Sequence, residues 1–290
     1  MGGTERINDL EMITLKGIAP TLKMNVYSDG DPFISQALKK WGSWELAETL
    51  LSLKYIKPGY TVLDIGANIG YYTLLFSHYV GPNGQVYSFE PEPRNFAILH
   101  GNVSLNNLSN IILSQLALSN RKCQRQLYTA SDNLGDHRLS YKQDRAAIMV
   151  ELDKLDHFFS NREKTVHFVK IDTQGAEEMV LDGMTELITM NTRHLVVLTE
   201  FSPILLMLMD GGYRSYLKLL TKLSARVIQF SSKENGQIKI SRITIDDLES
   251  IAKHLLSLGI EDEGTNIFLC FSQEAEGRFL HSQLKPFHTR

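Results

Sequence analysis

Residues 61–73 of the chain form the segment TVLDIGANIGYYT, which is the clearest indication of its class of fold. Its first five residues form a short apolar run that predicts a buried strand, and its end opens an apolar run that predicts a helix over 71–80. Glycines at positions 66 and 70 bound the turn between them. This order is typical of an open parallel α/β sheet, whose ligands bind beside the carboxyl end of such a strand.

Outward from this stretch, strands and helices alternate. We expect further strands over 85–89, 111–115, 167–172, 194–199, 226–230, 237–240 and 266–271. We expect helices over 45–53, 94–105, 176–189, 213–223 and 245–258. Residues 119–165 are expected to be irregular. The pattern predicts an α/β fold with a mostly parallel sheet, helices on both faces, and antiparallel strands at one edge.

The composition excludes several classes of protein. Thirty basic and 33 acidic side chains give a net charge of −3, which argues against a surface built to coat nucleic acid. The two cysteines have no metal-ligand spacing, and the histidines form no H-x-x-x-H pair, so we expect no dedicated metal site. No secretory segment and no apolar run of 18 residues is present, which leads us to expect a cytoplasmic protein that makes no use of a membrane.

Two acids at neighbouring strand ends indicate the ligand. Asp64 closes the strand at 61–65, and Glu90 closes the next strand, where a carboxylate can accept hydrogen bonds from both ribose hydroxyls. The glycine spacing G-x-x-x-G differs from the G-x-G-x-x-G of dinucleotide sites and suits a cationic ligand without phosphates, such as S-adenosylmethionine. Glu90 alone does not exclude NAD. The expected cofactor-binding residues are Asp64, Gly66, Ala67, Asn68, Gly70, Tyr71, Tyr72, Thr73, Glu90, Pro91, Asp172 and Gln174.

Over residues 41–272 the chain resembles the FkbM-type methyltransferases, within the class I S-adenosylmethionine-dependent group. The resemblance lies in blocks that occur in the family's order: WE (44–45), LDIGANIGYYT (63–73), GQVYSFEPEP (84–93), NVSLNN (102–107), KIDTQGAE (170–177) and TEF (199–201). The family often carries Glu where this chain has Gln174, so a carboxylate role at that point does not transfer.

The resemblance implies a Rossmann-like class I methyltransferase fold with a seven-stranded sheet. It further implies transfer of a methyl group from S-adenosylmethionine, most often to a hydroxyl of a saccharide or another natural product. The partner would then be a small hydroxylated molecule, with no nucleic acid, and the oligomeric state is left open. We expect an N-terminal extension over 1–45, the methyltransferase domain over 46–272 and a C-terminal tail over 273–290.

An alcohol reacts as a nucleophile only after its proton leaves, so the site needs a general base or a metal ion. Asp172 and Glu200 end neighbouring strands and are candidates for this role. His137 is the leading candidate, because a long loop places it between Asp136, as an orienting acid, and Arg138. A magnesium ion held by Asp172 and a second carboxylate is an alternative.

Lys170 lies within a strand that is otherwise apolar, so we expect it to pair with Glu177 or Glu200.

Other functions stay open at this point. Methylation of nucleic acid would require an Asn-Pro-Pro-aromatic or Asp-Pro-Pro-aromatic block after the fourth strand, and this chain has Asp-Thr-Gln-Gly over 172–175. Methylation of a protein is a further alternative. A non-catalytic domain that only binds the cofactor would keep the turn at 66–70 and would not need Asp172 or His137.

Overall fold

The computed structural model describes residues 10–163, 165–232, 237–260 and 264–285. Within these ranges the main sheet has eight strands, in the spatial order β12 (Ile238–Ile243), β11 (Arg226–Ser232), β13 (Thr265–Cys270), β10 (Val196–Phe201), β9 (Phe168–Ile171), β3 (Thr61–Ile65), β4 (Gln85–Phe89) and β5 (Ile111–Ser114). The strands from β10 to β5 run parallel, and β13 and β12 pair antiparallel with their neighbours. The expected class of fold is confirmed, with one strand more than seven because β12 extends the sheet edge.

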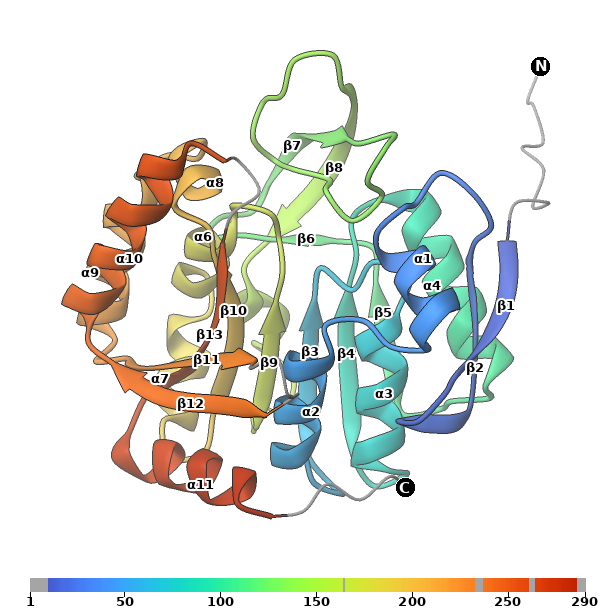
Figure 1. Ribbon diagram of the computed structural model, residues 1–290, viewed down its shortest axis with the longest axis horizontal. Coiled ribbons are helices and arrows are strands. Elements are labelled where there is room, and N and C mark those ends of the chain that lie inside the picture. Colours follow the sequence, from blue (N-terminus) through green and yellow to red (C-terminus); the bar gives the residue numbers. More distant parts are fainter. Residues whose placement is uncertain (1–9, 164, 233–236, 261–263, 286–290) are drawn as a thin grey trace.

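Helices cover both faces of this sheet (Figure 1). One face packs against α2 (Leu46–Tyr55), α3 (Tyr71–Val80), α4 (Pro93–Leu105) and α11 (Gln273–Gln283). The opposite face packs against α5 (Leu155–Phe158), α6 (Glu177–Asp182), α7 (Thr185–Asn191), α8 (Pro203–Met207), α9 (Gly212–Lys222) and α10 (Ile245–Leu258). Because both faces are covered, the central strands are mostly apolar, and their charged residues, Asp64, Lys170 and Glu200, lie toward the carboxyl ends.

The expected helix over 176–189 is two helices, with Gly183 between them. Gly183 lies between α6 and α7, where a Cβ atom would come within 2.0 Å of the carbonyl oxygen of Ser119. The chain therefore passes close to another backbone at this point, and α6 ends there.

The stretch 119–165, expected to be irregular, contains a second sheet. β7 (Cys123–Thr129) pairs antiparallel with β8 (Ala146–Asp153), which pairs in parallel with β6 (Ala117–Leu118). Exposed Gln124 and Gln126 alternate with inward-facing residues of β7, so the strand is only half apolar and its pattern is weak in the sequence.

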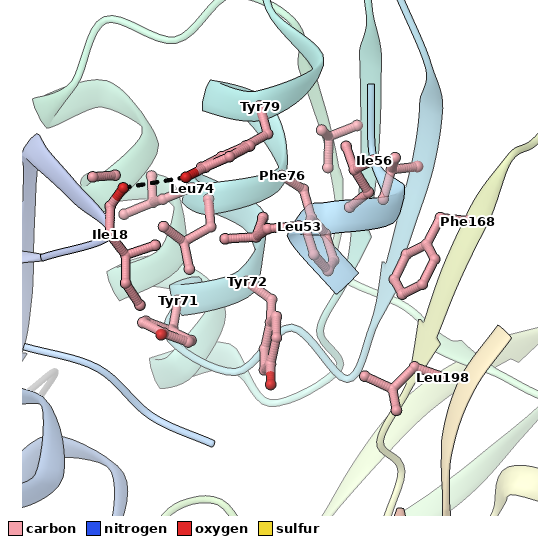
Figure 2. Packing of buried hydrophobic residues seen from close by; sticks show 14 of the residues in the cluster. Ile18, Leu53, Ile56, Tyr71, Tyr72, Leu74, Phe76, Tyr79, Phe168 and Leu198 are labelled. Carbon is pink, nitrogen blue, oxygen red and sulfur yellow. Dashed lines mark hydrogen bonds between the residues drawn. The ribbon is translucent and has the colours of Figure 1, made fainter. Parts of the chain in front are cut away.

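The N-terminal region, for which no element was predicted before residue 45, also has a defined structure. β1 (Leu10–Leu15) and β2 (Ala19–Tyr27) form a hairpin, and α1 (Ile34–Trp41) follows. Ile18, in the hairpin turn, accepts a 3.3 Å hydrogen bond from the Tyr79 hydroxyl of α3 (Figure 2).

Two asparagines at the end of α4, Asn102 within the helix and Asn106 directly after it, bind the hairpin. Asn102 accepts a hydrogen bond from the backbone N–H of Asn25 and donates one to its carbonyl oxygen, at 2.7 and 3.0 Å. Asn106 bonds in the same way to Lys23, at 2.8 and 2.7 Å. Asn102 and Asn106 are four residues apart along the helix, and Asn25 and Lys23 are two residues apart along β2. Because the two separations span similar distances, each asparagine faces its own partner. This gives the NVSLNN block a structural role.

At the other end of the chain, α11 packs against α2. Lys54 donates to the carbonyl oxygen of Gln283, and the Gln283 amide donates to the carbonyl oxygen of Leu51. Glu276 of α11 is buried and forms ion pairs with Arg226 and Arg242 of the edge strands. Residues 273–283, which the sequence placed in a tail, are therefore part of the packed fold.

Candidate functional site

The turn between β3 and α3 forms the floor of the site. Gly66 has φ +78, and a Cβ atom there would lie 1.8 Å from the carbonyl oxygen of Asp172, at the end of β9. The backbone at the end of β9 therefore occupies the space that a side chain at position 66 would need. Gly66 nevertheless lines both cavities described below. Gly70, with φ +98, lies against Leu99 of α4 and so serves the packing of two helices.

Asp64 is 1% exposed and lies beneath this turn. Its Oδ2 accepts a 2.6 Å hydrogen bond from the Thr73 hydroxyl, while its Oδ1 is buried and has no hydrogen-bond partner among the described residues. Burial raises the pKa of this carboxyl, and the Lys170 ammonium opposes that shift. Thr73 is fully buried between Asp64 and Ser88, so it orients the carboxylate from below.

Glu90 follows β4 and is 5% exposed. Its two oxygens accept hydrogen bonds from the backbone N–H groups of Asn68 and Glu92, at 2.8 and 2.9 Å. Burial raises the pKa of Glu90 to about 8. Its contact with Asn68 joins the end of β4 to the turn after β3.

Two adjoining cavities lie above these acids. The larger has a volume of about 660 Å³, including space open to solvent, and Glu90 and Pro91 line it together with Asn68, His137 and Gln174. One of its walls is apolar and is formed by Phe89, Leu116, Ala117, Leu118, Leu127, Leu139 and Ala176. These residues were not among the predicted site residues, although the apolar run at 116–118 was a usable signal.

The smaller cavity, of about 320 Å³, extends along the turn toward α2. Its lining includes Ile34, Trp44, Asp64, Ala67, Asn68, Tyr71, Tyr72, Lys170 and Asp172. Asn68, Gly66, Ile34 and Asp172 belong to both cavities, so the two volumes meet at the carboxyl ends of β3 and β9.

Lys170 pairs with Asp172, not with Glu177 or Glu200 as expected. Its Nζ lies 2.8 Å from Asp172 Oδ2, and only 4% of the residue is exposed. Residues two apart in a strand lie on the same face, which explains the pairing. Burial alone would lower the pKa of Lys170, but the carboxylates of Asp172, Glu45 and Asp64 raise it. The lysine is therefore charged at neutral pH.

Gln174 connects the ends of β9 and β10. Its Nε2 donates to Asp172 Oδ1 at 2.8 Å and to Glu200 Oε2 at 3.3 Å. Burial would raise the pKa of Asp172, but the Lys170 ammonium and these hydrogen bonds hold it below its usual value. Burial and the nearby Asp172 carboxylate raise the pKa of Glu200 well above its usual value. The two neighbouring carboxyl groups are thus shifted in opposite directions, with the pKa of Asp172 lowered and that of Glu200 raised.

Glu177 holds the loop that carries Gln174. Its carboxylate accepts hydrogen bonds from the backbone N–H groups of Thr173 and Gly175 and from the Thr173 hydroxyl. Its own backbone begins α6, and its side chain is buried.

His137 lines the larger cavity, but its environment differs from the expected one. Its Nδ1 accepts a 3.0 Å hydrogen bond from the backbone N–H of Ala130, so in the neutral ring the hydrogen is on Nε2. Burial lowers the pKa of His137. Asp136 does not orient this ring, because its carboxylate forms ion pairs with Arg138 and Arg145.

The loop around His137 is fixed to the floor of the site at one point. The carbonyl oxygen of Leu134 accepts hydrogen bonds from the side-chain amides of Asn68 and Asn95, at 2.9 and 3.1 Å. Asn95 is itself buried and accepts a hydrogen bond from the Tyr27 hydroxyl. The larger cavity is therefore bounded by a loop held in place from the turn after β3.

In the described part of the chain, no group of three or more His, Cys, Asp or Glu side chains is placed to hold a metal ion. Across the same residues, no helix has the length and apolar character needed to span a bilayer.

Comparison with known proteins was made on sequence and on structure. The sequence model of the methyltransferase FkbM domain matches residues 64–215, just over half of the chain. The model of protein-L-isoaspartate(D-aspartate) O-methyltransferase matches residues 8–116. A curated relative, the 31-O-demethyl-FK506 methyltransferase FkbM of Streptomyces tacrolimicus, is 47% identical over 47 residues, or 16% of this chain and 18% of the relative.

Two solved structures illustrate the likeness in three dimensions. The methyltransferase FkbM of Methylobacillus flagellatus KT is 12% identical, with a TM-score of 0.43, over 65% of this chain and 44% of that chain. An O-methyltransferase of Bacillus cereus, solved in complex with SAH, is 9% identical, with a TM-score of 0.44, over 79% and 82% of the two chains. The match thus spans under a fifth of the curated relative and under half of the first of these structures.

Proposed function

The chain belongs to the FkbM methyltransferase family, whose cofactor is S-adenosylmethionine, and we propose that it methylates a hydroxyl oxygen of a small molecule such as a saccharide or another natural product. The name of the S. tacrolimicus relative supports an oxygen on a small molecule as the acceptor. The observation that carries the proposal is the pair of buried carboxylates, Asp64 and Glu90, below two adjoining cavities.

The residues at this site fit S-adenosylmethionine. We propose that Glu90 accepts hydrogen bonds from the ribose hydroxyls, because it borders the larger cavity and each oxygen retains a lone pair after its one backbone contact. The apolar wall beyond it suits a flat, weakly polar ring. Asp64 suits the cationic end, because its Oδ1 is buried without a partner below the smaller cavity.

The other predicted cofactor-binding residues are assigned by the cavity that they line. Ala67, Asn68, Tyr71, Tyr72, Pro91 and Gln174 line one or both cavities and are proposed to contact the cofactor. When bound, S-adenosylmethionine supplies a methyl group already activated by a sulfonium. The chain therefore has to align the acceptor and to take its proton, and alignment alone is worth a large factor in rate.

Asp172 is proposed to align the acceptor hydroxyl. It belongs to both cavities, it is ionised, and the Lys170 ammonium and the Gln174 amide fix its two oxygens. A fixed, charged acceptor of hydrogen bonds can orient an O–H group without itself becoming protonated. Glu200, whose raised pKa favours its protonated form, is linked to Asp172 through the Gln174 amide. His137 could accept a proton at Nδ1 only after its bond to Ala130 breaks.

The proposal is tested with S-adenosylmethionine labelled in its methyl group. Hydroxylated small molecules, transfer RNA and an isoaspartyl peptide are offered in parallel, and we expect base-stable label in a hydroxylated small molecule. Label in the RNA or the peptide would contradict the proposal, and cofactor binding without any product would indicate a non-catalytic domain.

Asp172→Asn should bind the cofactor and lose at least tenfold in kcat. Asp246→Asn, an exposed position at the start of α10, serves as the matched control.

A further inference from the structure

Trp44, which comes shortly before α2, is a half-buried side chain that lines the smaller cavity together with Asp64 and Lys170. Its indole also packs against the core cluster on that face of the sheet. It lies 20 residues before Asp64, and so outside the residues 64–215 that match the FkbM domain. Neither the domain match nor the pattern of strand ends therefore gives this residue a role.

The backbone that carries Trp44 is held by α2 and α3. Glu45 has φ +44 and ψ +60, in the left-handed region, which an L residue adopts only where surrounding contacts hold it. The Tyr72 hydroxyl donates a 2.9 Å hydrogen bond to Glu45 Oε2. The Thr49 hydroxyl donates a 2.9 Å hydrogen bond to the carbonyl oxygen of Trp44 and lies 3.3 Å from the Tyr71 hydroxyl. These contacts fix the position from which the indole reaches the cavity.

The two tyrosines that hold this segment also place their rings in the wall of the smaller cavity. Figure 2 shows Tyr71 and Tyr72 next to each other on α3, and their rings lie edge to face with centroids 5.2 Å apart. The Nζ of Lys170 lies 4.6 Å from the centroid of the Tyr72 ring. The cavity thus has several aromatic rings in its wall, and one of them already faces a cation of the protein itself.

The charges around the same cavity favour a cationic ligand. Its charged lining residues are Asp64, Asp172 and Lys170, which are two carboxyl groups and one ammonium. Lys170 pairs with Asp172 at 2.8 Å, whereas Asp64 Oδ1 is buried and has no hydrogen-bond partner among the described residues. One carboxyl group is therefore left for a positive charge on the ligand.

We infer that Trp44 binds the sulfonium of S-adenosylmethionine against the face of its indole and so distinguishes this charged donor from its neutral product. The face of an aromatic ring attracts a cation within about 6 Å of the ring centroid, and tryptophan attracts it most strongly. In S-adenosylhomocysteine the sulfur is a neutral thioether, so this attraction is lost while the rest of the ligand is the same. The inference rests on the place given to the cationic end under the proposed function and does not depend on the acceptor.

The test compares Trp44→Leu with Trp41→Leu by calorimetry, using S-adenosylmethionine and S-adenosylhomocysteine. Leucine at position 44 keeps an apolar side chain and removes the ring. Trp44→Leu should weaken the binding of S-adenosylmethionine about 5-fold to 30-fold more than that of S-adenosylhomocysteine. Trp41 is 65% exposed and lines neither cavity, so Trp41→Leu should leave both affinities within about twofold of wild type.

The ratio of the two affinities is the readout that a purely structural role would not move. If Trp44 only supported the fold or the shape of the cavity, its loss would weaken both ligands alike, and equal changes would overturn the inference. Trp44→Phe keeps an aromatic face and should keep more of the wild-type ratio than Trp44→Leu does. A ratio in Trp44→Phe as low as in Trp44→Leu would also overturn it.

A second measurement leaves Trp44 in place. The chain has two tryptophans, so in Trp41→Phe the fluorescence comes from Trp44 alone. Saturation with S-adenosylmethionine should change this emission, and unchanged emission would overturn the inference, because the indole would not face the cofactor.

The assignments on which the inference rests fail with different signatures. Asp64→Asn removes the charge and can still accept from Thr73, so it tests the place of the cationic end. Weaker S-adenosylmethionine binding by Asp64→Asn, with an unchanged ratio in Trp44→Leu, would overturn the role of Trp44 alone. Failure of the proposed function is instead the absence of labelled hydroxylated product, which leaves both binding ratios as they are.

Discussion

Replacing Gly66 with alanine tests the close approach on which the site is built. The new Cβ atom would lie 1.8 Å from the carbonyl oxygen of Asp172, so the two backbones would have to move apart by more than about 1 Å. The displaced residue is the one that pairs with Lys170 and that lines both cavities. The substitution should therefore affect stability and cofactor binding together.

Gly59→Ala provides the matched control. Gly59 has φ +83, close to the +78 of Gly66, but a Cβ atom there would meet nothing within 4 Å. Both variants carry the cost of a left-handed alanine, about 1–2 kcal/mol, and both gain equally from a stiffer unfolded chain. Only Gly66→Ala adds the cost of overpacking, about 1–3 kcal/mol. The difference between the two variants is thus expected to be about 1–3 kcal/mol.

Urea unfolding followed by tryptophan fluorescence measures this difference, since Trp44 lines the smaller cavity. Calorimetry with S-adenosylhomocysteine should show at least tenfold weaker binding for Gly66→Ala and unchanged binding for Gly59→Ala. Equal free energies of unfolding for the two variants would refute the close contact between β3 and β9 at this turn.

Three further predictions address the cofactor, the hairpin and the loop. Glu90→Ala should weaken S-adenosylmethionine binding by about 1–3 kcal/mol in calorimetry, the worth of two neutral hydrogen bonds to the ribose, and unchanged affinity would exclude the ribose role. Asn102→Ala removes three hydrogen bonds, a buried one to Ile69 and two partly buried ones to Asn25, and should lower the free energy of unfolding in urea by about 2–4 kcal/mol; a loss below about 0.5 kcal/mol would argue against this anchor. His137→Ala should lower kcat less than tenfold, because its Nδ1 is engaged by Ala130, whereas a fall of ~10²–10⁴-fold would make His137 the base.

Local sequence patterns predicted the strands and helices that have strong apolar runs. The strand β3 and the helices α3 and α10 have the expected bounds, because strong apolar runs end at clear turn residues. The hairpin of β1 and β2 was not predicted. The backbone N–H groups at the edge of β2 donate hydrogen bonds to Asn102 and Asn106, which lie about 80 residues further along the chain. No local pattern can report such a partner.

The acids of the site show the same division. Their positions at strand ends followed from the sequence, since the carboxyl ends of parallel strands share one edge of the sheet. The protonation of these acids could not be predicted from the sequence, because the pKa of each depends on burial and on neighbours from other strands. Lys170 pairs two residues along its own strand with Asp172, and Gln174 places a neutral amide between Asp172 and Glu200.

The sequence by itself determined the α/β class and the family, because these depend on apolar periodicity and on short motifs within one stretch of chain. The tertiary structure shows which contacts the motif residues make. Gly66 makes room for the backbone of β9, and Glu45, 19 residues before Asp64 in the chain, accepts a hydrogen bond from the Tyr72 hydroxyl. Such roles depend on distances between elements remote in sequence, which only the packed fold sets.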